Sequence, residues 1–384
     1  MKNITIVFHD DNIHSGATSS MLDLIPGLAE QYYIRAIIPK RNGDLASYLE
    51  SKKIEYIRCP YYSSRVRSNI SKFEYSRFFL KNFIKILYSS IFYMLNIRFF
   101  VKSDIIYSNT SDSYFGFIAS ILFRKSHVSH IREFGIADQD VTHFIGDKLF
   151  YNLILKYSTK TIVISKSLRK HVSSHIKNVE IKNKLFLVYD DVHFDSIKLA
   201  YPHQHIDLKM LIVGTISLGK GQEFVIDSVY ELSKRGIKVG LGIAGDDTTQ
   251  YAMYLKNKVS QLGLDEQVIF HGFCKDMLKL RNQYPIAVIA SKSEAFGRVT
   301  IEAMGNNQLV IASDTGANPE LIQDKDNGFI FESKNVNSFC EVVENIVALD
   351  PSQIQGIIAS GEKSAQIFNG EKAARNISKI LSDI

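Results

Sequence analysis

The sequence is poor in cysteine and in net charge, and it carries no short tandem repeat. Its three cysteines, Cys59, Cys274 and Cys340, lie far apart. They form neither a disulfide framework nor a metal-ligand spacing, which favours a reducing cytoplasm. A formal net charge of +6 over 384 residues is too weak to indicate a nucleic-acid partner, and no aromatic-and-basic RNA-binding motif is present. The hydrophobic content of 45% is typical of a folded protein, and the length suits two domains.

Signals for export or for a membrane span are also missing. The chain starts MKNITIVFHD, and a buried strand is expected from Ile4, so we expect no signal peptide. The most apolar stretch, residues 83–101, has about the length of a membrane span. It carries Lys85 and Arg98 among other polar residues, which argues against a transmembrane helix. We therefore expect a cytoplasmic location.

Apolar, β-rich runs alternate with helical patterns along the chain, which predicts parallel sheets with helices on both faces. An irregular polar stretch separates two such series. We expect an N-terminal domain at 1–190, a hinge at 191–209 and a C-terminal domain at 210–384, whose last helix packs back on the first domain. The expected strands are Ile4–His9, Tyr33–Pro39, Ile54–Cys59, Asp104–Ser108, Val128–Ile131, Thr161–Ile164, Leu185–Val188, Leu211–Ile216, Val239–Ala244, Val268–His271, Ile286–Ala290 and Leu309–Ala312.

Residues 285–302, PIAVIASKSEAFGRVTIE, concentrate the chemistry of the chain. An apolar strand runs through a loop that ends at Gly297 into a helix expected from Arg298. The first amides of a helix lack intrahelical partners and the helix dipole is positive there, so this turn is a candidate phosphate site. Glu294 and Glu302 flank it, and carboxylates accept hydrogen bonds from vicinal sugar hydroxyls. Each glutamate alone is more readily explained as an ordinary loop or helix-start acid, but the combination indicates a nucleotide sugar.

Three further residues are candidates with ordinary alternatives. Gly16 lies in the polar loop after the first strand, where it allows close approach of a ligand or simply makes a turn. His130 ends the 128–131 strand and is as readily a satisfied buried histidine. Lys220 lies in the glycine-rich segment GTISLGKG, a plausible phosphate site that lacks the P-loop order of residues.

Residues 65–102 combine many Lys and Arg with Phe, Tyr, Ile and Leu, and Glu74 is the only acid in this stretch. Two interpretations remain for this stretch. A helix buried against the sheet fits residues 84–99. A basic and aromatic surface that contacts an anionic membrane fits residues 65–85.

Several of these motifs resemble those of the family 4 retaining glycosyltransferases. The resemblance rests on SEAFG at 293–297, TIEAM at 300–304, VIASDTG at 310–316, PELI at 319–322 and Asn327-Gly328. The 214–221 segment resembles the G-R-x-x-x-x-K-G motif of that family, with Thr215 in place of its arginine. HIREFG at 130–135 resembles the capsule and exopolysaccharide members. The implied fold is α/β of GT-B type, with two Rossmann-like doubly wound domains facing across a cleft.

The resemblance also implies roles for the candidate residues. Glu302 would hold the ribose, Glu294 and His130 would face the transferred sugar as catalytic residues, and Gly16 would lie close to the donor. Lys220 and the amides of Phe296 and Gly297 would bind the diphosphate. No metal or other cofactor is required in this family, so the D-x-D triplets at Asp138 and Asp324 are interpreted as solvated loop acids.

The expected reaction is transfer of a hexosyl or N-acetylhexosaminyl group, with retention, from a nucleotide diphosphate sugar such as a UDP-sugar. The expected acceptor is a polysaccharide or a polyprenyl-linked glycan at the cytoplasmic membrane face, reached through peripheral contact at 65–85. Two alternatives share the fold: a nucleotide-sugar epimerase and a non-catalytic partner subunit.

Overall fold

The computed structural model describes residues 1–41, 43–59, 63–194 and 208–384. The chain divides into two compact units. Unit 1 comprises Met1–Asp191 and Glu371–Ile384, and unit 2 comprises Val192–Gly370. Most of the hinge expected at 191–209 lies outside the described residues. Residues 371–384 belong to unit 1. From the sequence they were assigned to the C-terminal domain, with their helix expected to pack on the N-terminal domain.

Unit 1 contains a seven-stranded parallel sheet in the order β3-β2-β1-β5-β6-β8-β9. All seven strands expected in this half of the chain are present. Their bounds are β1 (Lys2–Val7), β2 (Tyr32–Pro39), β3 (Glu55–Cys59), β5 (Ile105–Ser108), β6 (Ser126–Ile131), β8 (Lys160–Val163) and β9 (Leu185–Leu187). An additional antiparallel pair, β4 (Arg65–Arg67) with β7 (Val141–His143), was not predicted. The order reverses between β1 and β5, which creates a switch point where ligands commonly bind.

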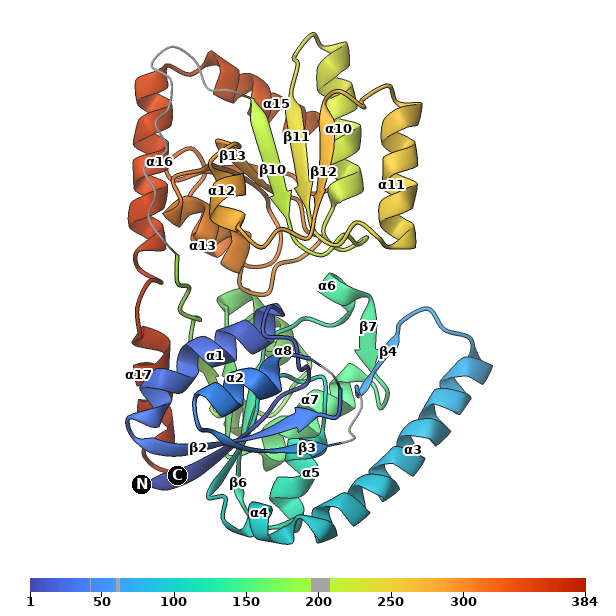
Figure 1. Ribbon diagram of the computed structural model, residues 1–384, viewed down its shortest axis with the longest axis vertical. Coiled ribbons are helices and arrows are strands. Elements are labelled where there is room, and N and C mark those ends of the chain that lie inside the picture. Colours follow the sequence, from blue (N-terminus) through green and yellow to red (C-terminus); the bar gives the residue numbers. More distant parts are fainter. Residues whose placement is uncertain (42, 60–62, 195–207) are drawn as a thin grey trace. The chain divides into compact units, whose positions relative to one another are not determined.

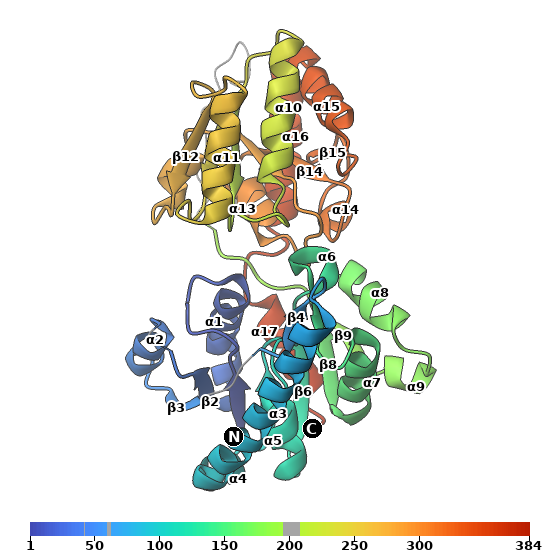
Figure 2. The ribbon, with the colours of Figure 1, turned by 90° about the vertical axis from the view of Figure 1, so that its right-hand side faces the viewer.

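The helices of unit 1 lie on both faces of this sheet (Figure 2). Side chains alternate between faces along a strand, so Ile4 and Ile6 of β1 pack with α1, α2 and α17, whereas Val7 packs with α4, α5 and the end of α3. The helices are α1 (Gly16–Ala29), α2 (Leu45–Ser51), α3 (Lys72–Leu95), α4 (Ile97–Val101), α5 (Phe115–Leu122), α6 (Ile136–Gln139), α7 (Asp147–Tyr157), α8 (Lys166–Ser174), α9 (Val179–Lys182) and α17 (Lys372–Leu381).

Unit 2 contains a six-stranded parallel sheet in the order β12-β11-β10-β13-β14-β15. Its strands are β10 (Lys209–Val213), β11 (Gly240–Ala244), β12 (Val268–Gly272), β13 (Ile286–Ile289), β14 (Leu309–Ser313) and β15 (Phe329–Phe331), of which β15 was not predicted. Its helices are α10 (Gln222–Lys234), α11 (Gln250–Gln261), α12 (Met277–Arg281), α13 (Arg298–Gly305), α14 (Asn318–Leu321), α15 (Val336–Ala348) and α16 (Pro351–Ala365) (Figure 1). The switch point of this sheet lies between β10 and β13.

Helix α3 corrects the expectation of a buried helix at 84–99. It begins earlier, at a capping box in which Ser71 and Glu74 bond each other's backbone amides. Its side chains are mostly exposed, and only Asn82, Ser89 and Tyr93 are buried. The residues that do enter the core at this point belong to the next helix, α4, through Phe99 and Phe100. Among the described residues, α3 is the one helix long and apolar enough to cross a bilayer, judged by length and composition alone.

Candidate functional site

Two predicted residues of unit 2 come together at its switch point. Lys220 follows β10 and Glu294 follows β13, and these strands are neighbours in the sheet. The Lys220 Nζ lies 2.6 Å from Glu294 Oε1, and the Ser291 hydroxyl donates to the same oxygen at 2.6 Å. The Glu294 side chain is 13% exposed and that of Lys220 is 34% exposed. A half-buried cation and carboxylate at the carboxyl end of a parallel sheet form a polar site that solvent still reaches.

Two glycines allow the loop around Glu294 to adopt its shape. Gly297, with φ of 94°, occupies the left-handed region immediately before α13, which begins at Arg298 as expected. A Cβ on Gly316 would lie 2.4 Å from the Glu294 amide nitrogen, so the loop after β14 can approach Glu294 only through glycine. The Ala317 amide then donates to the Glu294 carbonyl at 2.7 Å. These contacts fix the backbone that carries the carboxylate.

Glu302 lies on α13 and is held by an arginine that sequence reasoning missed. The Arg281 Nη2 donates to Glu302 Oε2 at 3.0 Å, and Nη1 donates to Gln308 at 2.7 Å. The Arg281 side chain is 3% exposed, and burial lowers its pKa while Glu302 raises it. Arg281 ends α12, which precedes β13, and nothing in the local sequence marks it as a partner of Glu302. The Glu302 side chain remains 31% exposed, so its carboxylate both pairs with the buried arginine and is accessible from solvent.

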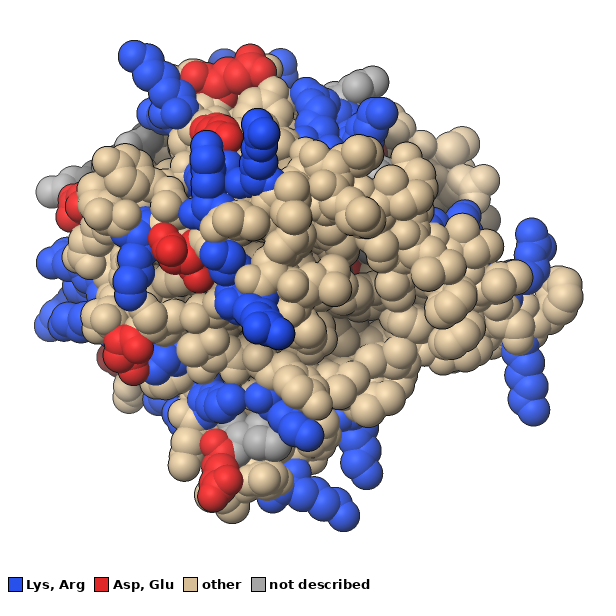
Figure 3. Space-filling model, turned by 90° about the horizontal axis from the view of Figure 1, so that it is seen from below, with Lys and Arg blue, Asp and Glu red and all other residues tan. Residues whose placement is uncertain are grey.

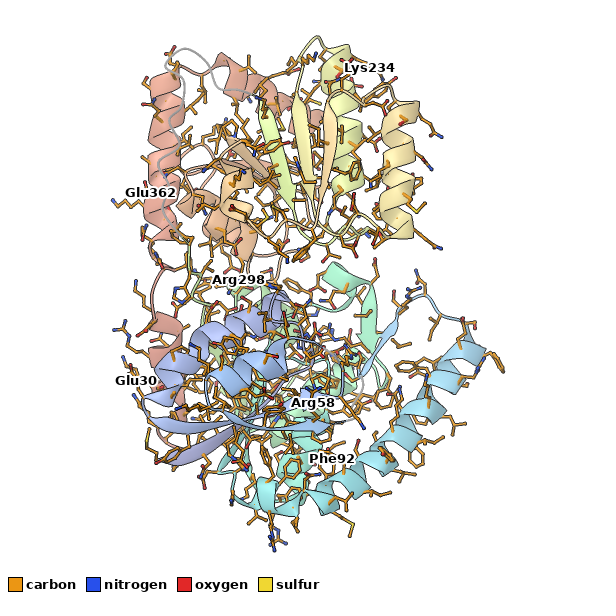
Figure 4. The ribbon with its side chains drawn as sticks, viewed as in Figure 1. Glu30, Arg58, Phe92, Lys234, Arg298 and Glu362 are labelled. Carbon is orange, nitrogen blue, oxygen red and sulfur yellow. The ribbon has the colours of Figure 1, made fainter. Side chains whose placement is uncertain are left out.

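Two further predicted residues flank the start of α13. The Phe296 side chain is buried, and its ring packs edge-on against Phe368 with centroids 5.7 Å apart. Its side chain therefore anchors the loop from inside. Arg298 is the first residue of α13 and is half-buried (Figure 4).

His130 of unit 1 is fully buried at the end of β6. Its Nδ1 lies 2.8 Å from the Tyr107 hydroxyl and 3.2 Å from Arg132 Nη2. Because a guanidinium only donates, Nδ1 is the acceptor and the ring carries its proton on Nε2. Burial, followed by the charge of Arg132, lowers the pKa of His130 well below its usual range. Within the part of the chain that is described, Nε2 has no hydrogen-bond partner.

Gly16 and His130 are connected through the switch point of unit 1. Gly16 is the first residue of α1 and not a loop residue, and a Cβ there would meet no atom within 4 Å. The next residue, Ala17, accepts a bond of 2.8 Å from Asn109 Nδ2, and Asn109 Oδ1 accepts from Arg132 Nε at 3.0 Å. Arg132 also pairs with Asp190 at 2.5 Å. The buried arginine thus joins the end of β6 to the start of α1.

Arg65 was expected at the membrane surface, and this part of the prediction is wrong. Its side chain is 4% exposed and pairs with Glu133 at 2.5 Å. The Ser111 amide donates to the same Glu133 oxygen at 2.8 Å. Arg65 lies in β4, which pairs with β7 and so is covered by that strand. Arg132 and Glu133 thus have different charged partners, Asp190 and Arg65.

Asp138 is not the solvated loop acid that the sequence suggested. It is half-buried and accepts bonds from the amides of Phe134, at 3.1 Å, and Gly135, at 2.8 Å. Burial raises the pKa of Asp138 to about 6 against the effect of these bonds. Asp324 is exposed, as expected. No group of three or more His, Cys, Asp or Glu side chains suited to a metal ion occurs among the described residues.

Comparison with known proteins places this geometry in context. The family model described as "Glycosyl transferases group 1" matches residues 194–363. The chain is 22% identical to the putative glycosyltransferase EpsD of Bacillus subtilis over 207 residues, 54% of each protein. It is 24% identical to protein CapJ of Staphylococcus aureus over 288 residues, 71% of each. The EpsD match thus covers about half the length of that relative.

Solved structures share the fold over the whole chain. The crystal structure of Anabaena Alr3699/HepE in complex with UDP and glucose superimposes with a TM-score of 0.75 at 19% identity, covering 100% of both chains. The apo form of the lipopolysaccharide outer core galactosyltransferase WaaB gives 0.72 at 14% identity, covering 100% of this chain and 99% of that one. The fold is that of the GT-B glycosyltransferases.

Proposed function

We propose that the protein is a retaining glycosyltransferase of family 4 that takes its sugar from a nucleotide diphosphate sugar, with UDP as the first nucleotide to test. The observation that carries this proposal is the Lys220–Glu294 pair at the switch point of unit 2, 2.6 Å apart and followed by the glycine-preceded helix that bears Glu302. Structures of Alr3699/HepE in complex with UDP and UDP-glucose support this donor class.

In this proposal the ion pair separates when the donor binds. Lys220 would turn to the diphosphate, assisted by the backbone at Phe296 and Gly297, and Glu294 would accept hydrogen bonds from the sugar hydroxyls. Glu302, oriented by Arg281, would accept from the ribose. Preformed charges around a leaving diphosphate stabilise the transition state without reorganisation. No metal ion is part of this proposal.

Gly16 and His130 of unit 1 retain their implied roles as proposals. The neutral His130 ring would offer its Nε2 proton to a sugar hydroxyl, because Nδ1 is already occupied by Tyr107 and Arg132. A buried N–H without a partner is costly and is therefore expected to find one. His130 would then be a hydrogen-bond donor in catalysis and not a general base.

The proposed acceptor is a polysaccharide or a polyprenyl-linked glycan at the cytoplasmic face of the membrane, contacted by the basic and aromatic surface that begins at Arg67. The exposed and acid-poor helix α3 supports a membrane-associated acceptor of this kind. Arg65 has no part in that surface.

A donor screen tests the proposal. The purified protein would be incubated with radiolabelled nucleotide sugars, with and without membranes, beside a Lys220→Ala variant. We expect release of nucleoside diphosphate from one donor, transfer only with membranes, and loss of both in the variant. An epimerised donor would instead indicate an isomerase. Absence of any reaction with every donor would indicate a partner subunit.

A further inference from the structure

Helix α3 touches the rest of unit 1 only along a narrow stripe. Near its start the Tyr75 hydroxyl bonds the Phe144 carbonyl, and the Phe79 ring packs on that of Phe144 with centroids 5.8 Å apart. Near its end Tyr93 packs on Phe115 at 4.6 Å and bonds its carbonyl at 2.8 Å. Between these two attachments the helix bridges the surfaces of α5 and α7.

An apolar groove lies under this bridge. It has a volume of about 170 Å³ and exposes no polar atom. Its walls come from Ile86 of α3, Phe117 and Ile118 of α5, and Leu153 and Ile154 of α7. A cavity of about 150 Å³ with similar walls stays dry and binds small hydrocarbons. Because its walls expose no polar atom, this open groove suits a hydrocarbon chain better than a polar ligand.

A smaller pocket with both polar and apolar walls continues the groove along the same seam. The two share Ile86, Tyr114 and Ile118, and the second is also lined by Asn82 and Lys85. The Tyr114 hydroxyl is buried, and within the described residues it has no hydrogen-bond partner. The nearby acid, Asp112, is already bonded by Ser63 at 2.5 Å. A hydroxyl and an ammonium beside an apolar groove match a chain that ends in a phosphate.

The surface around the groove is also apolar, with basic residues beside it. Large apolar side chains of α3 are exposed, including Leu80, Leu87 and Met94 at 60%, 55% and 76%. The helix also carries several Lys and Arg and only one acid, Glu74. On the right of Figure 3, where α3 lies, the surface is mostly uncharged, with Lys and Arg at its rim. An anionic lipid is complementary to such a surface, whereas an acid-poor basic helix would repel a second copy of itself.

We propose that the groove under α3 binds the hydrocarbon chain of a membrane lipid phosphate, with its phosphate at Lys85 and Tyr114. The inference deepens the proposed function and rests on it, because this lipid would carry the acceptor glycan. The remaining exposed face of α3 would lie among the lipid headgroups, so that the chain passes from the bilayer into the groove without crossing water.

Calorimetry with two short lipid phosphates, farnesyl phosphate and dodecyl phosphate, tests the groove without a bilayer. We expect the full chain to bind at least one of them below its micelle concentration. Leu153→Trp fills the groove and should weaken binding at least tenfold. Ile145→Asp, in the loop that also lines the groove, is a second variant that adds a charge with little demand on packing. Val347→Trp, on an exposed site of α15, is the matched control and should bind as the native chain does.

The two probes also identify the source of the chain. Preference for farnesyl phosphate favours a polyprenyl carrier, and preference for dodecyl phosphate favours an acyl lipid. Binding that both groove variants leave unchanged, or dimerisation of the native chain through α3 seen by light scattering, would overturn the inference. Donor hydrolysis measured on the same samples separates the two proposals. Hydrolysis without lipid binding refutes the groove alone, whereas lipid binding without hydrolysis refutes the transferase alone.

Discussion

At the scale of single residues, the two glutamates of unit 2 should fail in different ways. Glu302→Gln should weaken binding of free UDP, because a ribose contact is equally present before and during transfer and so affects affinity more than turnover. Glu294→Gln should lower turnover instead, by roughly 1.5–3 kcal/mol for a lost charged hydrogen bond. It should not weaken UDP binding, since UDP lacks the sugar and the substitution removes a carboxylate that competes with the diphosphate for Lys220. Calorimetry with UDP and steady-state kinetics measure the two effects.

A stability control is needed for these two variants, because Glu302 is the partner of the buried Arg281. Glu302→Gln removes the carboxylate beside a buried guanidinium, so its thermal unfolding must be compared with that of Glu294→Gln. Equal UDP affinity in two well-folded variants would show that the roles are assigned wrongly, whatever the reaction.

Buried histidines make unit 1 sensitive to acid. Burial lowers the pKa of His127 to about 3, and its ring nitrogens bond Ser108 at 2.9 Å and Ser158 at 2.8 Å. The unfolded chain binds a proton near pH 6.5, and the folded chain does not until about pH 3. The stabilisation is therefore present above pH 6.5 and decreases as the pH falls toward 3, by about 1.4 kcal/mol per pH unit.

Denaturant unfolding of unit 1 between pH 7.5 and 4.5 measures this slope. His127→Asn should reduce this slope, because it removes the buried ring. A slope that is the same in native and His127→Asn proteins would mean that the ring is already charged when folded.

The sequence identified functional residues that belong to a local motif. It missed residues whose role depends on a partner far away in the sequence. Glu294, Gly297 and Lys220 belong to strand–loop–helix segments whose geometry the chain order dictates. Arg281 and Asp190 acquire their meaning from partners 21 and 58 positions away, Glu302 and Arg132. No local pattern carries that information. Arg65 was misplaced for the same reason, since its partner Glu133 lies 68 positions further on.

At the scale of elements, the membrane contact proposed for helix α3 can be tested directly. Lys72, Arg77 and Lys81 are all exposed on its first half. Each basic residue near an anionic bilayer contributes about 1 kcal/mol, so replacing all three by Glu should strongly weaken co-sedimentation with anionic vesicles. Donor hydrolysis should be unchanged, because these residues lie outside the candidate site. Lys234, Lys256 and Lys279 of unit 2, replaced together, provide a control of equal charge.

Strands were predictable and this helix was not, for a physical reason. The central strands of a parallel sheet are buried on both faces and give continuous apolar runs, such as 286–289. Short edge elements such as β4 and β15, with three residues each, give no such run. Helix α3 is apolar without being buried, so apolarity alone pointed to the wrong environment. If the native protein did not bind anionic vesicles, α3 would have to contact a different partner.

At the scale of the whole molecule, the chain returns to its first unit at its end. Helix α17 places Ala374 and Ile377 in the same core as α1. A Cβ on Gly27 of α1 would lie 2.6 Å from the Ala374 Cβ, so the two helices approach as closely as glycine allows. The Ala373 amide donates to Asp191 at 2.8 Å, which joins the start of α17 to the last residue of the first segment of unit 1. A helix more than 180 positions from the core it completes is held there by packing and not by local sequence.

Removing that packing should destabilise unit 1 alone. Ile377→Ala deletes a fully buried side chain, and such a change costs about 2–5 kcal/mol. Hydrogen exchange followed by mass spectrometry should show faster exchange in β1 and α1, with β10 and β13 unaffected. Ile346→Ala, an equally buried residue of α15, is the matched control and should produce the opposite pattern, because its side chain belongs to the core of unit 2. If Ile377→Ala loosened β10 and β13 while β1 and α1 kept their protection, α17 would have to be assigned to unit 2, and the division of the chain at Gly370 would be wrong.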